Sequence, residues 1–165
     1  STKTGALGYV DCMKEIVDYS KQQELEFKNL FHATGSAGTQ SGLVVGKAIT
    51  EWEGEINGIA ITKDRSKLTK EIEVLAKETG EMLKVKIDLR NIKVNDDYIG
   101  EAYGAETEGA KEAISLFAKM EGILLDNVYS GKAAAGMIDY IRKGKTEKDA
   151  NLLFLHTGGN IQLFK

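Results

Sequence analysis

The amino-acid sequence predicts an α/β fold with three layers, in which helices cover both faces of a mostly parallel, twisted β-sheet. Short apolar runs of strand length alternate along the chain with longer segments in which apolar side chains recur every three or four positions. This alternation is typical of βαβ units, which build parallel sheets. The 165 residues fit a single α/β domain, residues 1–165, with room for a hydrophobic core.

Five segments have the apolar spacing of helices. In the first of them, Val10, Met13 and Val17 recur at three- and four-residue steps and so share one face. The third begins at Ser66, and we expect Gly80 to end it because glycine is common just after the last helical turn. The predicted helices are residues 7–22, 39–52, 66–80, 107–121 and 131–143.

Five shorter runs have the character of strands. The first two are apolar along most of their length, as expected for strands buried on both faces. In the third, Val85, Ile87 and Leu89 alternate with charged residues. The predicted strands are residues 27–33, 56–61, 82–89, 123–125 and 152–156, with an irregular stretch at 95–106.

The segment between the first strand and the second helix is rich in glycine and hydroxyl side chains. It consists of Thr34, Gly35, Ser36, Ala37, Gly38 and Thr39. Backbone N–H groups converge at such a turn, and the dipole of the following helix favours negative charge. Gly35 and Gly38 permit positive φ and close approach of a ligand, and Ser36 and Thr39 add donors. The segment predicts a phosphate-monoester site; the alternative is an ordinary strand-to-helix turn.

Composition restricts the classes of partner. The net charge is −3 and no dense Lys/Arg cluster occurs, so we expect no nucleic-acid partner. The apolar runs are too short to span a bilayer, and no secretory leader begins the chain. The single Cys12 cannot form an internal disulfide. These features predict a cytoplasmic protein that contacts no membrane, and we predict no metal site.

Further polar and aromatic residues follow predicted strands. Ligands bind at the carboxyl ends of strands in parallel sheets, and Thr157 and Tyr129 both lie in such loops. Tyr103 lies in the irregular stretch. Ser130 and Lys132 follow Tyr129 in the same loop. Taken one at a time, these residues have ordinary structural explanations. The tyrosines can be half-buried aromatic side chains, Ser130 a helix N-cap, and Lys132 a solvated lysine of a first helical turn. Together with the phosphate loop they predict a cofactor site.

Three segments in order resemble one known family: residues 33–39, 121–133 and 156–159. They are similar to the C-terminal half of the D-cysteine desulfhydrase and 1-aminocyclopropane-1-carboxylate deaminase family, which are fold-type II pyridoxal-phosphate enzymes. The resemblance covers essentially the whole chain and implies the large, cofactor-binding domain of a tryptophan synthase β-like fold. Asn127 departs from the family pattern, in which proline is usual.

The resemblance implies a site for pyridoxal 5'-phosphate. Residues 34–39 would hold its phosphate, and Thr157 would face the pyridine nitrogen. A neutral hydroxyl there leaves that nitrogen largely unprotonated, which suits elimination. Tyr103 and Tyr129 match the family's substrate-side tyrosines and are candidate catalytic residues. Ser130 stands where the deaminases typically have glutamate, so the implied reaction is β-elimination from a small, D-cysteine-like amino acid to pyruvate, ammonia and sulfide.

The resemblance also implies that the Schiff-base lysine lies in an N-terminal half without a counterpart in this sequence. Lys132 corresponds to a different lysine of the family. We therefore expect full activity to need a complementing N-terminal segment or subunit, and we expect a homo-oligomer. Two alternatives remain open: a non-catalytic module that binds a phosphorylated small molecule, and an isolated or engineered α/β fragment without activity.

Overall fold

A computed structural model describes residues 1–62 and 64–164. The helices are α1 (Lys3–Gln22), α2 (Gly38–Thr50), α3 (Arg65–Leu83), α4 (Glu108–Glu121) and α5 (Ser130–Arg142), with a short 3-10 helix, η1, at Asn160–Phe164. The strands are β1 (Phe27–Thr34), β2 (Glu55–Ala60), β3 (Lys93–Asn95) and β4 (Asn151–Leu155). They form one sheet in the order β3-β2-β1-β4, and all neighbours run parallel.

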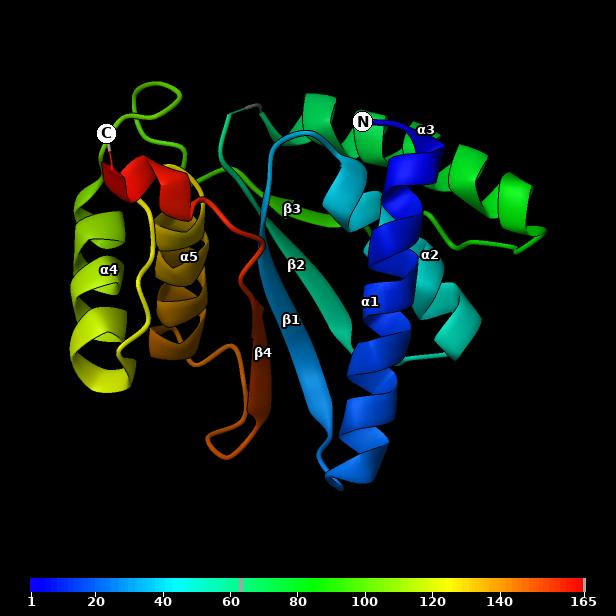
Figure 1. Cartoon of the computed structure of the whole chain (residues 1–165), viewed down its shortest axis with the longest axis horizontal. Helices are drawn as coiled ribbons and strands as arrows, with labels where there is room; N and C mark the ends of the chain where they lie inside the picture. Colours follow the sequence, from blue (N-terminus) through cyan, green and yellow to red (C-terminus); the bar gives the residue numbers. More distant parts are fainter. Residues whose placement is uncertain (63, 165) are drawn as a thin grey trace.

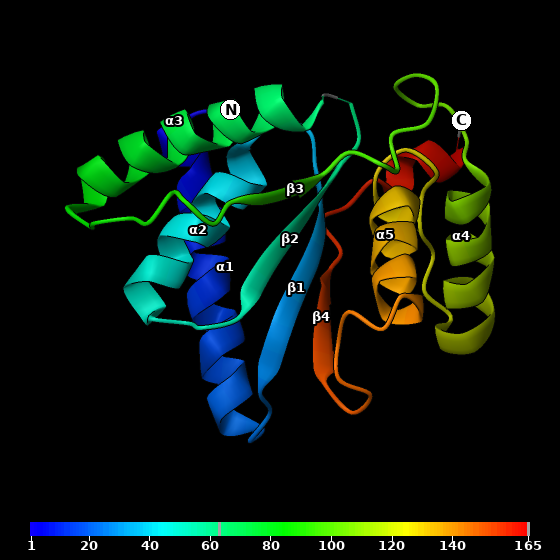
Figure 2. The same cartoon turned by 180° about the vertical axis from the view of Figure 1, so that it is seen from behind.

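The sheet lies between two layers of helices (Figure 1), and the view from behind shows the same arrangement (Figure 2). Helices α1, α2 and α3 lie on one side of the sheet, and α4 and α5 lie on the other. The predicted three-layer α/β fold is confirmed. The five predicted helices are present, each with ends within a few residues of the expected bounds.

The central strand β1 is apolar because both of its faces are buried. Neighbouring residues of a strand point to opposite faces. Leu30 packs into a cluster with Leu43 of α2, whereas Phe31 packs with Ile59 and lies edge-on to the ring of Tyr140, 5.1 Å between centroids. Since α5 covers the second face, β1 sits at the centre of the molecule and fixes where the loop that follows it emerges.

Helices α1 and α2 pack closely at two glycines of α2. A Cβ atom at Gly42 would lie 2.3 Å from the carbonyl oxygen of Ala6, and one at Gly46 would lie 2.6 Å from Cβ of Met13. Neither position has room for a side chain. The spacing of four residues places both glycines on one face of α2, which lets the two backbones approach.

We expect Gly42→Ala to lower the free energy of unfolding by about 1–3 kcal/mol, because the new methyl group collides with backbone that cannot move alone. Gly8→Ala is the matched control, since Gly8 lies in α1 with nothing within 4 Å of its Cβ position. There alanine is expected to stabilise by up to about 1 kcal/mol, the usual helix-propensity gain. Urea unfolding of both variants is the measurement, and similar effects at the two positions would contradict the close crossing.

The predicted strand at residues 82–89 is wrong. Helix α3 continues past Gly80 to Leu83, and Lys84 ends it in the left-handed conformation at φ 58°. The alternation that suggested a strand has another cause: Ile87 and Leu89 pack as partly buried side chains against the core between α1, α2 and β2. Gly80 permits this packing, because its Cβ would lie 2.3 Å from Cδ1 of Ile87. The third strand is instead β3.

The predicted strand at residues 123–125 is also wrong, since this segment pairs with no strand. Leu125 is buried with Ala113 of α4, Ala134 of α5 and Phe154 of β4. Its apolar character therefore reflects packing between the two helices and the sheet edge, and the backbone stays outside the ladder.

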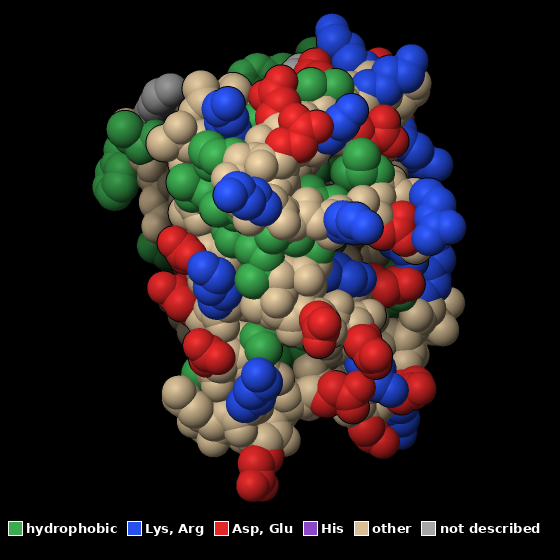
Figure 3. Space-filling model, turned by 90° about the vertical axis from the view of Figure 1, so that its right-hand side faces the viewer, with side chains coloured by type: hydrophobic (Ala, Val, Ile, Leu, Met, Phe, Trp, Pro, Cys, Tyr) green, Lys and Arg blue, Asp and Glu red, His purple; other side chains and the backbone are tan. Residues whose placement is uncertain are grey.

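Acidic and basic side chains are interspersed over the face formed by α1, α2 and α3, with apolar groups between them (Figure 3). Within residues 1–62 and 64–164, none of the helices combines the length and the apolar content that crossing a bilayer requires.

Candidate functional site

The first turn of α2 presents backbone N–H groups that no side chain caps. Ala37 precedes the helix in the left-handed conformation at φ 66°, and its methyl group accepts no hydrogen bond. The other helices have a side-chain acceptor at this point: Thr2 for α1, Asp64 for α3, Thr107 for α4 and Asp126 for α5. Among the five α-helices of residues 1–62 and 64–164, α2 is thus the one whose first turn has no side-chain acceptor, which leaves it for an external one. A bound phosphate is such an acceptor.

Asp126 organises the loop that carries Tyr129. Its side chain is fully buried. One carboxylate oxygen accepts the N–H groups of Val128 and Tyr129 at 2.8 Å, and the other accepts the N–H of Ser130 at 2.8 Å and its hydroxyl at 2.6 Å. The same carboxylate lies against Gly159, whose Cβ would sit 2.3 Å from Oδ1. Asp126 therefore fixes the start of α5 by hydrogen bonds and packs against the loop after β4.

A hollow of about 540 Å³ lies where these loops meet, at the carboxyl edge of the sheet, and this is an ordinary size for a small-molecule site. Six of the predicted site residues line it: Gly35, Ser36, Thr39, Tyr103, Tyr129 and Thr157. The structure thus brings residues 122 positions apart in the chain to one place. Hollows of similar size occur elsewhere, for example beside Lys47 and Trp52 at the other end of α2, but none of the predicted site residues lines that one.

Three predicted site residues do not line the hollow. Thr34 is buried behind the loop, with 1% of its surface exposed. Ala37 and Gly38 contribute backbone at the start of α2. Gly38 also leaves no free space beside its Cα, because a Cβ there would lie 2.8 Å from the hydroxyl of Ser1.

The two predicted tyrosines are partners. Their hydroxyl groups are hydrogen-bonded to each other, and the rings meet edge to face with centroids 6.3 Å apart. The hydrogen bond with Tyr103 raises the pKa of Tyr129, and burial and the negative charge of Asp126 act in the same direction. The Tyr129 hydroxyl therefore keeps its proton at neutral pH and can act as a donor.

The ordinary structural explanation of Lys132, a solvated lysine in a first helical turn, is wrong. Its side chain is fully buried, and Nζ donates a hydrogen bond of 2.5 Å to the carbonyl oxygen of Ile99. Burial lowers its pKa, and the nearby charge of Asp126 opposes this. The ammonium group supports the loop before α4 and does not line the hollow.

Sequence reasoning missed other residues of the site. Tyr9 of α1 and Ile61 and Thr62 after β2 also line the hollow. The carboxyl end of β2 could have indicated the latter two, because β2 is the neighbour of β1. Asp126 could have been found as the first residue of a turn, because Asp side chains commonly accept the N–H group two residues further along, here that of Val128.

The fold and the site define a class of protein: an α/β domain with a candidate anion site at the carboxyl edge of its parallel sheet. Comparison with family models places residues 1–158 in one family, described as pyridoxal-phosphate dependent enzyme. The chain belongs to this family. Its cofactor is pyridoxal phosphate, and the uncapped start of α2 beside the hollow fits the phosphate of that cofactor.

Individual relatives agree with this assignment. D-cysteine desulfhydrase of Serratia proteamaculans is 39% identical over 164 residues, which is 99% of this chain and 49% of that protein. D-cysteine desulfhydrase of Yersinia enterocolitica is 38% identical over the same shares. A crystal structure of an ACC deaminase homologue superposes with a TM-score of 0.85 at 37% identity, over 96% of this chain and 46% of that one. The chain thus spans about half the length of the curated relatives it matches.

Proposed function

We propose that this chain forms the cofactor-holding part of a lyase that eliminates sulfide from a small, D-cysteine-like amino acid, giving pyruvate and ammonia. The observation that carries the proposal is the hollow between the uncapped start of α2, Thr157 and the hydrogen-bonded tyrosine pair. The names of the curated relatives support the substrate class.

Bound pyridoxal phosphate supplies an electron sink for the substrate's α-carbon. In the proposal, N–H groups of residues 35–39 hold its phosphate, and the Thr157 hydroxyl meets the pyridine nitrogen without protonating it. Tyr129, whose pKa is raised, holds a proton that it can donate to the departing sulfur. Tyr103 lies on the solvent side of the pair and orients the Tyr129 hydroxyl through their hydrogen bond.

The proposal includes a second protein segment. No lysine among the described residues lines the hollow, and the chain matches only half of its relatives' length. A complementing segment or subunit would therefore supply the lysine that binds the cofactor covalently. Self-association of the chain belongs to the same proposal, and exposed apolar side chains such as Met120 and Phe164 support it.

Ser36→Asp is expected to weaken binding of pyridoxal phosphate to this chain at least tenfold, about 1.4 kcal/mol. The new carboxylate repels the phosphate and competes for the same N–H groups. Ser115→Asp is the matched control, because Ser115 is exposed on α4, away from the hollow. Fluorescence titration of both variants is the measurement, and equal affinities would contradict a phosphate site at residues 35–39.

Activity is tested by mixing the chain with the part of the Serratia desulfhydrase that it does not match. We expect the mixture, with pyridoxal phosphate, to release pyruvate from D-cysteine, and Tyr129→Phe to slow this release by about 10²-fold or more. Release from L-cysteine alone, or from neither isomer, would reject the proposed reaction.

The second candidate is a module that binds the phosphorylated ligand without chemistry. It is favoured by the same lack of a lysine along the hollow in the described residues. Borohydride reduction of the mixture followed by peptide mapping distinguishes the two candidates. A lysine adduct supports the enzyme, whereas saturable binding without any adduct supports the module.

A further inference from the structure

Three polar side chains are buried behind residues 35–39, and each leaves one polar atom without a hydrogen-bond partner. They are His32 and Thr34 of β1 and Gln40 of α2, whose exposed fractions are 0%, 1% and 0%. The unpartnered atoms are Nε2 of His32, Oγ1 of Thr34 and Oε1 of Gln40. Buried polar atoms are nearly always hydrogen-bonded, so three together require an explanation.

The three side chains lie near Gly58, on the face of the sheet that α2 covers. His32 and Thr34 are two residues apart in β1 and so point to the same face. His32 is the register partner of Gly58 on the neighbouring strand. A Cβ atom at Gly58 would lie 2.0 Å from Oε1 of Gln40 and 2.9 Å from Cγ2 of Thr34. The carboxamide of Gln40 therefore occupies the space that a side chain at position 58 would fill.

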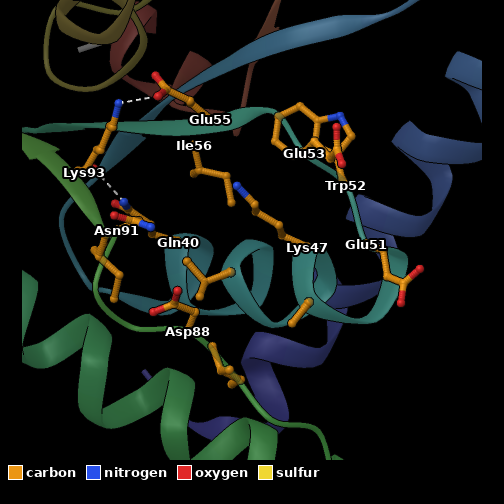
Figure 4. Close-up of a pocket in the computed structure, with 14 residues that line it drawn as sticks. Gln40, Lys47, Glu51, Trp52, Glu53, Glu55, Ile56, Asp88, Asn91 and Lys93 are labelled. Atoms are coloured by element: carbon orange, nitrogen blue, oxygen red, sulfur yellow. Dashed lines mark hydrogen bonds and ion pairs between the residues drawn. The ribbon is translucent and has the colours of Figure 1, made fainter.

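Existing hydrogen bonds fix what each unpartnered atom can do. Nδ1 of His32 is 2.9 Å from the carbonyl oxygen of Ala33, so this nitrogen carries the proton and Nε2 presents a lone pair. The Gln40 amide group donates to the carbonyl oxygen of Lys93 at 2.7 Å (Figure 4), so Oε1 is its free acceptor. Burial lowers the pKa of His32 to about 4, which keeps the ring neutral.

The cluster therefore has two acceptors that cannot bond to each other, and one hydroxyl with a single proton. Thr34 can satisfy one acceptor and must then leave the other unpaired. A water molecule has two O–H donors for the two acceptors and a lone pair for the Thr34 hydroxyl. Three hydrogen bonds are the usual number for a buried water.

We propose that His32, Thr34 and Gln40 form a binding site for one buried water molecule, beside the Gln40 carboxamide that covers Gly58. Thr34 is the last residue of β1 and Gln40 lies in the first turn of α2, so the water joins the two ends of the 35–39 loop. The site does not need a bound cofactor, and its test is independent of the proposed reaction.

Two measurements on this chain test the site. A crystal structure is expected to show one water oxygen within about 2.7–3.2 Å of all three atoms. In solution, the ¹⁵N resonance of Nε2 of His32 is expected at the position of a hydrogen-bonded acceptor. It should stay there in Thr34→Val, because the water and not the hydroxyl is the donor.

Thr50→Val is the matched control, since the Thr50 hydroxyl donates to the carbonyl oxygen of Gly46 at 2.9 Å, near the other end of α2. The shift of the Nε2 resonance in Thr50→Val shows how large a change the loss of a distant hydroxyl causes. The proposal is overturned if Thr34 Oγ1 bonds directly to His32 or Gln40 with no density between them. It is equally overturned if the Nε2 resonance has the position of a free lone pair, or moves to it in Thr34→Val.

Discussion

Asp126→Asn is expected to lower the free energy of unfolding by about 2–4 kcal/mol. The carboxylate accepts four hydrogen bonds, two at each oxygen, in a fully buried position. An amide keeps one acceptor oxygen and turns its NH₂ group toward two other donors. At least two buried donors then lose their partner, and the donors face each other.

Asp64→Asn is the matched control. Asp64 also caps a helix, since it accepts the N–H of Lys67 at 2.9 Å, but it is exposed. Asparagine caps helices about as well as aspartate, so we expect a change within about 0.5 kcal/mol. Urea unfolding at neutral pH is the measurement. If the two variants are equally stable, Asp126 is not the buried organiser that its hydrogen bonds indicate.

The same substitution also tests how the site is held. Because the carboxylate lies against Gly159 as well as the start of α5, loosening it should displace Thr157 and Tyr129 together. The hydrogen bonds described above for the Asp126 carboxylate go to residues 128–130, and none of these reaches the start of α2. In the proposed function, inorganic phosphate needs only residues 35–39. We therefore expect Asp126→Asn to weaken the binding of inorganic phosphate less than it weakens the binding of the complete cofactor.

The helices and the glycine-rich turn at residues 35–39 could be predicted from the sequence because their signals are local. Apolar spacing identifies a helix within its own residues, and Gly35 and Gly38 mark a turn without reference to the rest of the chain. The assignment of Thr157 and Tyr129 to the same site came from their places after predicted strands, which works because parallel strands end at one edge. The hollow that they line agrees with this reasoning.

The errors arose where packing between distant segments decides the structure. The alternation of Ile87 and Leu89 is that of a strand, but these side chains fill the layer between helices. Gly80 is typical of a helix end, yet it serves the contact with Ile87. The role of Gln40 was not predictable, because it depends on a backbone group that only the folded chain brings near, the carbonyl oxygen of Lys93, 53 positions from Gln40. The hydrogen-bond partners of Asp126 lie within four residues of it, but its contact with Gly159 does not follow from the local sequence.

The stability of this protein is expected to fall between about pH 6.5 and pH 4 because of His32. Burial lowers the pKa of His32 from 6.5 to about 4 in the folded state. Below pH 6.5 the unfolded chain takes up a proton at this residue that the folded chain does not, so unfolding becomes easier as the pH falls. Above pH 6.5 both states are neutral and the contribution is flat.

The size of the effect follows from the difference between the two pKa values. Each unit corresponds to about 1.4 kcal/mol, so His32 alone destabilises the folded state by about 3 kcal/mol at pH 4 relative to pH 7. Between pH 5 and pH 7 it should account for about 2 kcal/mol, in a range where most carboxylates are still ionised.

His32→Gln removes the group and should flatten the curve of stability against pH over this range, whereas His156→Gln retains His32 and should keep the wild-type slope. Urea unfolding across pH 5–7 gives these slopes directly. A wild-type slope in His32→Gln would mean that the pKa of His32 is the same in the folded and unfolded states, which contradicts a buried, neutral ring.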